Sequence, residues 1–219
     1  MSAREDTLDT LDAQANPAVL ILGIGNLLWA DEGFGVRALE HLHAHYAFPP
    51  NVQLLDGGTQ GIYLVQHVEA ADILVVFDAV DYGLPPGTLK EVRDEEVPHF
   101  MGVKKMSLHQ TGFQEVLAMA QLLGRYPAHL LLVGVQPVEL DDFGGSLRPE
   151  VKAQIEPAIA IVLTYLAKFG VYPSPRVTPV KDALLGTAAL HLQGYEAQRP
   201  SADEACRVGD ERFLARWVV

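Results

Sequence analysis

Three short apolar runs, the first two of which are each followed by a turn and a stretch of helical periodicity, constrain the fold of this chain most. They cover residues 18–23, 52–55 and 73–77. The first and third are almost wholly apolar, as expected of strands buried on both faces of a parallel sheet. Apolar residues recur at helical spacing from Gly33 to about Tyr46, and residues 60–70 read as a second helix. This alternation predicts a parallel sheet with helices on both faces.

The connection after the third run breaks the alternation. Only the turn-rich DYGLPPG, residues 81–87, separates it from a strand-like stretch at 88–92. A parallel crossover needs a dozen or more residues, so this fourth strand should run antiparallel. A helix over about 112–123, a fifth strand over 130–135 and a long amphipathic helix over about 149–169 follow. We therefore expect an α/β fold of the three-layer α/β/α type, with a mixed five-stranded sheet and one strand antiparallel.

The two ends of the chain differ in composition from this core. Residues 1–17 are acidic and polar, so we interpret them as a mobile N-terminal lead-in and neither a signal nor a transit peptide. Residues 18–170 form the single expected domain. Beyond Gly170, three prolines interrupt a polar sequence, which predicts a partly disordered C-terminal extension over 171–219 with at most one helix.

Charge and composition narrow the classes of partner. The chain has 219 residues and a net charge of −12, which argues against nucleic acid and anionic membranes as partners and suits a protein partner or a cation. No apolar stretch approaches the roughly 20 residues that span a bilayer. The only cysteine, Cys206, provides no disulfide framework, so we expect a cytoplasmic protein.

The sequence GIGNLLWADEGFG, residues 23–35, stands where a dinucleotide-binding turn would follow the first strand. Such a turn needs three glycines and a helix N-terminus free of negative charge. Leu28 occupies the third glycine position, while Asp31 and Glu32 would repel a phosphate; no Walker lysine follows. We therefore expect no nucleotide. Either the two acids cap the following helix, stabilising it by roughly 1 kcal/mol, or they carry chemistry.

Two further residues favour chemistry at this edge of the sheet. Asp78 ends the third strand at the carboxyl edge, where open α/β sheets bind ligands, and a buried carboxylate there needs a donor or a cation. His109 lies on the loop expected to return to the same edge. Carboxylates with one imidazole form a hard-to-borderline metal site. HExxH and nucleophile-elbow motifs are absent, so the residues themselves predict only an acidic, metal-binding pocket.

Several motifs in order resemble one protein family, the hydrogenase maturation endopeptidases. The resemblance runs from about residue 19 to 169 and is carried by GIGNLLWADEGFGVRALEHL, LLDGGTQG, VVFDAV, GTLKEVRDEEVP, SLHQTGF and LLLVGVQPVEL…EPAIAIVL. Members of this family trim the C-terminal extension from the large subunit of [NiFe]-hydrogenases. The resemblance implies a mixed five-stranded sheet between helix layers, and it places Glu32, Asp78 and His109 at the family's three nickel-contacting positions.

The resemblance also implies how the activity depends on metal. Nickel would be contacted through the substrate, after its insertion into the large-subunit precursor, and not held as a resident cofactor; Cd²⁺ or Zn²⁺ can substitute. Cleavage would follow a His or Arg after the last metal-binding cysteine motif of the substrate. We expect six residues of the two glycine loops to bind substrate: Gly25, Asn26, Asp31, Asp56, Gly57 and Gly58.

The catalytic group stays open at this stage, with Asp78 and Glu32 as candidates. The family is catalogued with aspartic-type peptidases, but no paired-aspartate sequence in this chain secures that label. Two alternatives remain: a non-catalytic metal-sensing chaperone of the hydrogenase subunit, and a metal-dependent α/β hydrolase or aminopeptidase with its own ion.

Overall fold

A mixed five-stranded sheet forms the centre of the protein. The computed structural model describes residues 16–100, 108–180 and 190–199, so most of the expected lead-in and Cys206 lie outside the described residues. The sheet has the order β3-β1-β4-β6-β5. Its strands are β1 (Val19–Ile24), β3 (Val52–Gly58), β4 (Ile73–Ala79), β5 (Leu89–Arg93) and β6 (His129–Val135). All neighbours are parallel except β5, which is antiparallel to β6, so the predicted mixed sheet is confirmed.

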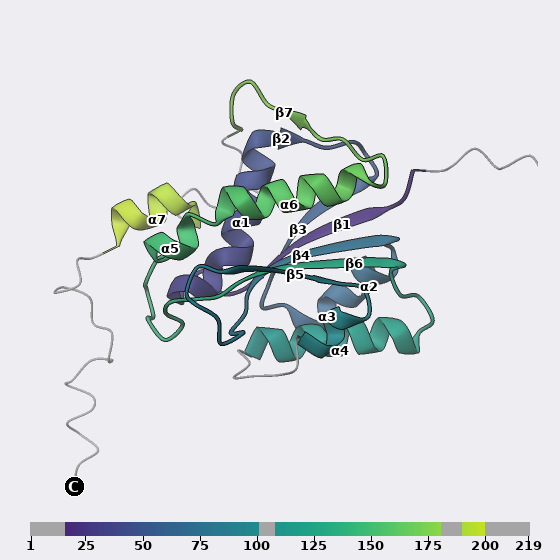
Figure 1. The fold of residues 1–219 in the computed structure, drawn as a ribbon, viewed down its shortest axis with the longest axis horizontal. Helices are drawn as coiled ribbons and strands as arrows, with labels where there is room; N and C mark the ends of the chain where they lie inside the picture. The colour runs from purple at the N-terminus through teal and green to yellow at the C-terminus, as the bar shows by residue number, and fades with distance from the viewer. Residues whose placement is uncertain (1–15, 101–107, 181–189, 200–219) are drawn as a thin grey trace, which may run out of the picture.

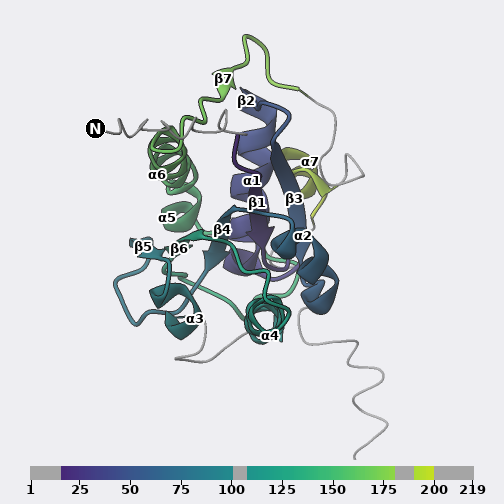
Figure 2. The same cartoon turned by 90° about the vertical axis from the view of Figure 1, so that its right-hand side faces the viewer.

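Helices cover both faces of the sheet, as the alternation predicts (Figure 1). One layer contains α1 (Phe34–His45), α5 (Pro149–Lys152) and α6 (Ile155–Ala167). The other contains α2 (Val65–Glu69), α3 (Glu96–Phe100) and α4 (Leu108–Leu122). Figure 2 shows the sheet between the two layers. Alternate strand residues supply the two cores: Ile21 and Val75 pack toward α1 and α6, whereas Leu22 and Val76 pack toward α2 and α4. The three-layer α/β/α prediction is therefore confirmed.

Short elements complete the described chain. They are the 3₁₀ turns η1 (Ala30–Gly33) and η2 (Gly61–Leu64), the strand pair β2 (Tyr46–Ala47) and β7 (Ser174–Pro175), and the helix α7 (Leu192–Gln198). Both β7 and α7 belong to the C-terminal extension, and α7 is the helix of its described part. Among the described helices, none is long and apolar enough to cross a membrane.

The long helix predicted over 149–169 is instead two helices, α5 and α6, separated at Ala153 and Gln154. The cause is Pro157, which has no N–H and whose ring would clash with the carbonyl of Ala153 in a continuous helix. Proline is tolerated in the first turn of a helix, and Pro157 lies in the first turn of α6. The chain therefore ends one helix before the proline and begins another that includes it.

The strand order reverses between β1 and β4. From β1 the chain proceeds to β3 on one side, whereas from β4 it proceeds to β5 and β6 on the other. In open α/β sheets, ligands bind in the crevice at the carboxyl ends of the strands that flank such a reversal. The turn after β1 and Asp78 near the end of β4 flank this point, so the expected location of the site agrees with the topology.

The first turn of α1 packs backbone to backbone against the ends of these two strands. A Cβ atom on Gly35 would lie 2.1 Å from the carbonyl oxygen of Phe77 and 2.3 Å from that of Ile24. A Cβ atom on Gly23 would lie 2.5 Å from the carbonyl oxygen of Gly35. No side chain larger than hydrogen fits at either position. These glycines therefore bring α1 close to the sheet at the carboxyl edge.

We expect Gly35→Ala to lower the free energy of unfolding by about 2–4 kcal/mol, because the new methyl group forces α1 away from β1 and β4. Equilibrium urea denaturation measures this loss. Gly112→Ala is the matched control: its Cβ would lie 3.4 Å from the Cα of Gly61, an ordinary contact, and alanine favours the helix α4 by up to about 1 kcal/mol. Equal losses in both variants would contradict the packing argument.

Candidate active site at the carboxyl edge of the sheet

The turn after β1 is held in a conformation that only glycine allows at position 25. Gly25 has a φ of +135°, and a Cβ atom there would lie 1.8 Å from the carbonyl oxygen of Glu32. Its N–H donates to the carbonyl of Gly58 at 3.1 Å, which joins this turn to the loop after β3. Glycine at position 25 is therefore required by the protein's own backbone, and its contact with substrate stays a prediction.

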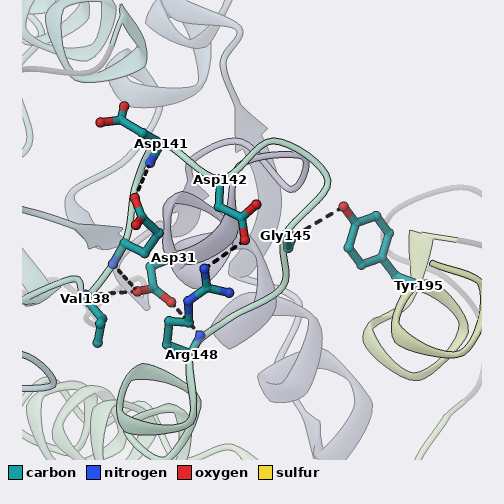
Figure 3. A network of polar contacts seen from close by, with 8 residues as sticks. Asp31, Val138, Asp141, Asp142, Gly145, Arg148 and Tyr195 are labelled. Atoms are coloured by element: carbon teal, nitrogen blue, oxygen red, sulfur yellow. Dashed lines mark hydrogen bonds and ion pairs between the residues drawn. The ribbon is translucent and has the colours of Figure 1, made fainter. Parts of the chain in front are cut away.

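Asp31 is a buried anchor for a distant loop. Its Oδ2 accepts hydrogen bonds from the N–H groups of Val138 and Glu139 at 2.9 Å, and its Oδ1 accepts one from the N–H of Arg148 at 2.7 Å (Figure 3). The side chain is fully buried. The helix α1 has no side-chain cap, and Asp31 accepts its hydrogen bonds from other segments, so the alternative in which Asp31 caps this helix is wrong. Asp31 instead fixes the loop over residues 138–148, which follows β6, against the turn after β1.

Further contacts hold the same loop to the turn. Gly144 donates its N–H to the carbonyl of Leu28 at 2.7 Å. The rings of Trp29 and Phe143 meet edge to face with centroids 5.4 Å apart, and the two residues form a β-bridge. Ala30 lies between Trp29 and Asp31 in the sequence and has a φ of 37°, which is strained for a residue with a Cβ atom. The surrounding contacts thus impose a local backbone conformation that the residue itself disfavours.

The C-terminal extension reaches this network through α7. Tyr195 Oη donates to the carbonyl of Gly145 at 3.3 Å, as Figure 3 shows. Glu196 accepts hydrogen bonds from Ser146 Oγ and Lys152 Nζ, both at 2.9 Å. Burial raises the pKa of Glu196, but these two donors outweigh it, so the pKa is lower than usual. An ionised Glu196 therefore connects α7 to the loop that Asp31 holds.

Asp78 and Glu32, two of the three predicted nickel contacts, both lie at this edge. Asp78 is fully buried, and its Oδ1 accepts the N–H of Ala79 at 2.8 Å. Glu32 is half-buried in η1, next to Asp31. The alternation of strand residues points Asp78 to the same face as Val76, which packs toward α2 and α4. Asp78 therefore faces the layer that contains the start of α4.

The backbone brings His109 to the same edge. His109 lies in the first turn of α4, and a Cβ on Gly61 would be 3.9 Å from the Cα of Gly112, so this end of α4 lies beside the loop after β3. The side chain of His109 is outside the described part of the structure. Within that part, no group of three or more His, Cys, Asp or Glu side chains could hold a metal ion. The three-residue nickel contact stays a prediction.

The loop after β3 is shaped by Asp56. Its Oδ1 accepts the N–H of Gly58 at 2.9 Å, and Gly58 adopts a φ of +41°. Burial raises the pKa of Asp56; the Gly58 hydrogen bond and the positive charge of Arg37 oppose that shift without cancelling it. Asn26, in the neighbouring turn, accepts the N–H of Leu28 at 3.0 Å. Both predicted substrate-binding side chains therefore order their own loops, and substrate binding by them stays a prediction.

Sequence reasoning missed two features of this edge. The loop over 138–148 contains no chemical motif. Its hydrogen bonds with Asp31 join residues more than 100 positions apart, so no local sequence pattern could predict these bonds. Tyr82, in the β4–β5 connection, is also part of the edge: the negative charge of Asp78 adds to burial in raising the pKa of Tyr82. A single tyrosine in a turn-rich segment gives no signal of such proximity.

Large apolar side chains are exposed around the site. They follow the carboxyl ends of all four parallel strands. These residues, which we call the apolar rim, are Leu28, Ile62, Tyr63, Leu84, Val138 and Phe143. Exposed apolar groups gathered at one edge are typical of a surface that contacts another protein.

We expect Asp31→Ala to lower the free energy of unfolding by roughly 3 kcal/mol, because three backbone N–H groups lose their acceptor. Urea denaturation measures the loss. Asp141→Ala, at an exposed aspartate of the same loop, should change stability by less than about 0.5 kcal/mol. A small effect of Asp31→Ala would show that the loop holds its position without the carboxylate.

We expect Asp56→Asn to raise stability at neutral pH. The amide oxygen can still accept the Gly58 N–H, and the cost of burying the charge disappears. The pKa of Asp56 is raised in the folded state, so above that pKa the buried charge destabilises the parent protein. Below about 3.9 the carboxyl group is protonated in both the folded and the unfolded state, and the destabilisation disappears. Urea denaturation from pH 7 to pH 4 should show the advantage of the variant shrinking with acidity. An advantage that grows with acidity would contradict the assigned shift.

Comparison with known proteins identifies the family of this chain. The model of the family described as hydrogenase maturation protease matches residues 36–165. The chain is 65% identical over 202 residues to the hydrogenase expression/formation protein HupD of Thiocapsa roseopersicina (92% of this chain, 91% of that protein) and 64% identical over 202 residues to HupM of Azotobacter chroococcum (92% and 96%). The solved structure of the hydrogenase maturating endopeptidase HybD from E. coli superposes with a TM-score of 0.69 at 42% identity, covering 72% of this chain and 97% of that one. The chain belongs to the hydrogenase maturation protease family.

Proposed function

We propose that this protein is an endopeptidase that removes the C-terminal extension of a [NiFe]-hydrogenase large subunit after nickel has been inserted. The observation that carries the proposal is the position of Asp78. It is a fully buried carboxylate at the carboxyl end of β4, beside the strand-order reversal, and it faces the layer in which the first turn of α4 contains His109. A carboxylate at the carboxyl edge of an open α/β sheet, where such folds bind their ligands, is suited to a cation or a reacting group.

Nickel enters this proposal as part of the substrate. Thiolates of the large subunit hold the ion, and Glu32, Asp78 and His109 offer the two carboxylates and one imidazole that approach it. Three ligands alone bind a divalent ion weakly, so the substrate has to supply the others. The protease would therefore act only on a subunit that already carries its metal.

Hydrolysis of the peptide bond then requires a water molecule and a group that takes its proton. Asp78 and Glu32 are the candidates. Asp31 is a poor one, because its two oxygens already accept three backbone hydrogen bonds. An aspartic-type mechanism would require a second aspartate that shares a proton with Asp78.

The apolar rim supports a protein as substrate. Its side chains lie after β1, β3, β4 and β6 and so border the acidic site on several sides. A small-molecule or aminopeptidase site would need only an enclosed pocket. An exposed apolar border instead suits a folded partner that presents its C-terminal segment to the site.

Release of the C-terminal peptide from a purified, nickel-loaded large subunit tests the function directly, with mass spectrometry as the readout. We expect cleavage by the parent, and a loss of at least about 100-fold in Asp78→Asn, Glu32→Gln and His109→Ala with the fold retained. Asp72→Asn is the matched control at the opposite end of β4, where Asp72 accepts the N–H of Ala18 at 2.8 Å; its cleavage rate should equal the parental rate.

The substrate is varied in the same assay. A nickel-free large subunit whose metal-binding cysteines are replaced should resist cleavage, with or without added Ni²⁺. Efficient cleavage of that substrate would contradict nickel sensing and leave the protease intact. Tight binding of the loaded subunit without peptide release would instead indicate a chaperone, and release of N-terminal residues an aminopeptidase.

A further inference from the structure

The hydroxyl of Tyr82 occupies the space of a missing side chain in the sheet. A Cβ atom on Gly134 would lie 2.0 Å from Tyr82 Oη and 2.8 Å from its Cζ. Any residue other than glycine at position 134 would therefore displace the phenol. The hydroxyl is buried.

The strand register places this hydroxyl between two charged residues. Gly134 on β6 is the direct partner of Asp78 on β4 and of Lys90 on β5. Direct partners on neighbouring strands point to the same face and lie about 5 Å apart. The Nζ of Lys90 is 4.9 Å from the centroid of the Tyr82 ring. The phenol thus fills the middle of a row that begins with the Asp78 carboxylate and ends with the Lys90 ammonium.

A buried glutamine fixes the backbone that carries the phenol. Gln136 Oε1 accepts the N–H groups of Tyr82 at 2.8 Å and Leu84 at 3.1 Å. Its Nε2 donates to Asp81 Oδ1 at 3.0 Å. Only 6% of Gln136 is exposed. The β4–β5 connection is therefore held at three points by one side chain, which determines where the ring of Tyr82 enters.

Packing alone does not explain this arrangement. The strand β6 reads HLLLVGV, and glycine is the weakest choice within such a run, because it adds no packing and is entropically costly to order. A valine at position 134 would fill the same space with better strand propensity. The chain instead has glycine there and a phenol from another segment, whose hydroxyl lies over the strand position next to Asp78.

We propose that Tyr82 is a positioning residue for Asp78: its phenol, seated over Gly134, sets the orientation of the Asp78 carboxylate toward the bound peptide. This inference rests on the proposed function, in which Asp78 acts on the substrate. Tyr82 itself need not touch the substrate. Gly134 is part of the same arrangement, because any larger residue at this position would displace the ring of Tyr82.

Tyr82→Phe tests the inference, because it removes one oxygen and keeps the ring. With nickel-loaded large subunit as substrate, we expect kcat to fall about tenfold or more while KM changes by less than about twofold. Tyr165→Phe is the matched control: Tyr165 is a buried tyrosine of α6 that packs on Phe169 on the other face of the sheet. Its kcat should equal the parental value. A parental kcat in Tyr82→Phe would overturn the inference.

Gly134→Ala gives an independent route to the same effect. The new methyl group should displace the phenol and lower kcat as Tyr82→Phe does, whereas in a Tyr82→Ala background it should cause no further loss. A full additional loss in that background would show that Gly134 acts without the phenol and would overturn the inference.

A structural readout keeps the two proposals separate. If the parent fails to cleave the loaded subunit, the proposed function is contradicted, and crystal structures of the parent and of Tyr82→Phe decide the positioning role. A changed orientation of the Asp78 carboxylate in the variant supports that role. An unchanged orientation overturns it.

Discussion

Backbone-to-backbone packing between α1 and the carboxyl ends of β1 and β4 determines the geometry of the whole edge. It needs hydrogen atoms in place of side chains at Gly23 and Gly35, because their Cβ atoms would enter neighbouring carbonyl oxygens. Because α1 lies so close to β1 and β4, the turn over residues 25–33 is tightly packed, and Gly25 lies against the carbonyl of Glu32. The two acidic residues of the turn are thereby placed at the strand-order reversal. The glycines resemble those of a nucleotide-binding turn, yet they serve internal packing here.

Three aspartates at this edge differ in what surrounds them. Asp31 accepts three backbone N–H groups and anchors the loop over 138–148. Asp56 orders its own loop and carries a raised pKa through burial. Asp78 lies near the end of a buried strand beside the phenol of Tyr82, and its Oδ1 accepts the N–H of the next residue in the chain. The same residue type thus serves as an anchor, a turn former and a candidate catalytic group, according to the donors that each position provides.

Local patterns predicted most of the fold because the relevant forces are local. Apolar runs of strand length identified the parallel strands, and the shortness of the 81–87 connection identified the antiparallel one. The break between α5 and α6 was missed although Pro157 marks it, because apolar periodicity continues through the proline. For the site, strand ends located Asp78 and Glu32 at one edge. The role of Asp31 and the place of Tyr82 depend on residues from other strands, and one sequence does not reveal such pairings.

The C-terminal extension is connected to the site by a chain of specific contacts. The relatives HupD and HupM match 92% of this chain and so share most of the extension, whereas the E. coli structure matches 72%. Beyond the contacts of Glu196, the buried Arg37 of α1 pairs with Glu40 at 2.8 Å and donates to the carbonyl of Leu190, just before α7. The helix α7 thus binds both α1 and the loop that Asp31 anchors. Arg37 lies one turn of α1 beyond Gly33. A shift of α7 would therefore reach the turn that carries Glu32 through α1 and also through the loop that Asp31 anchors. In this chain the extension therefore supports the geometry of the carboxyl edge.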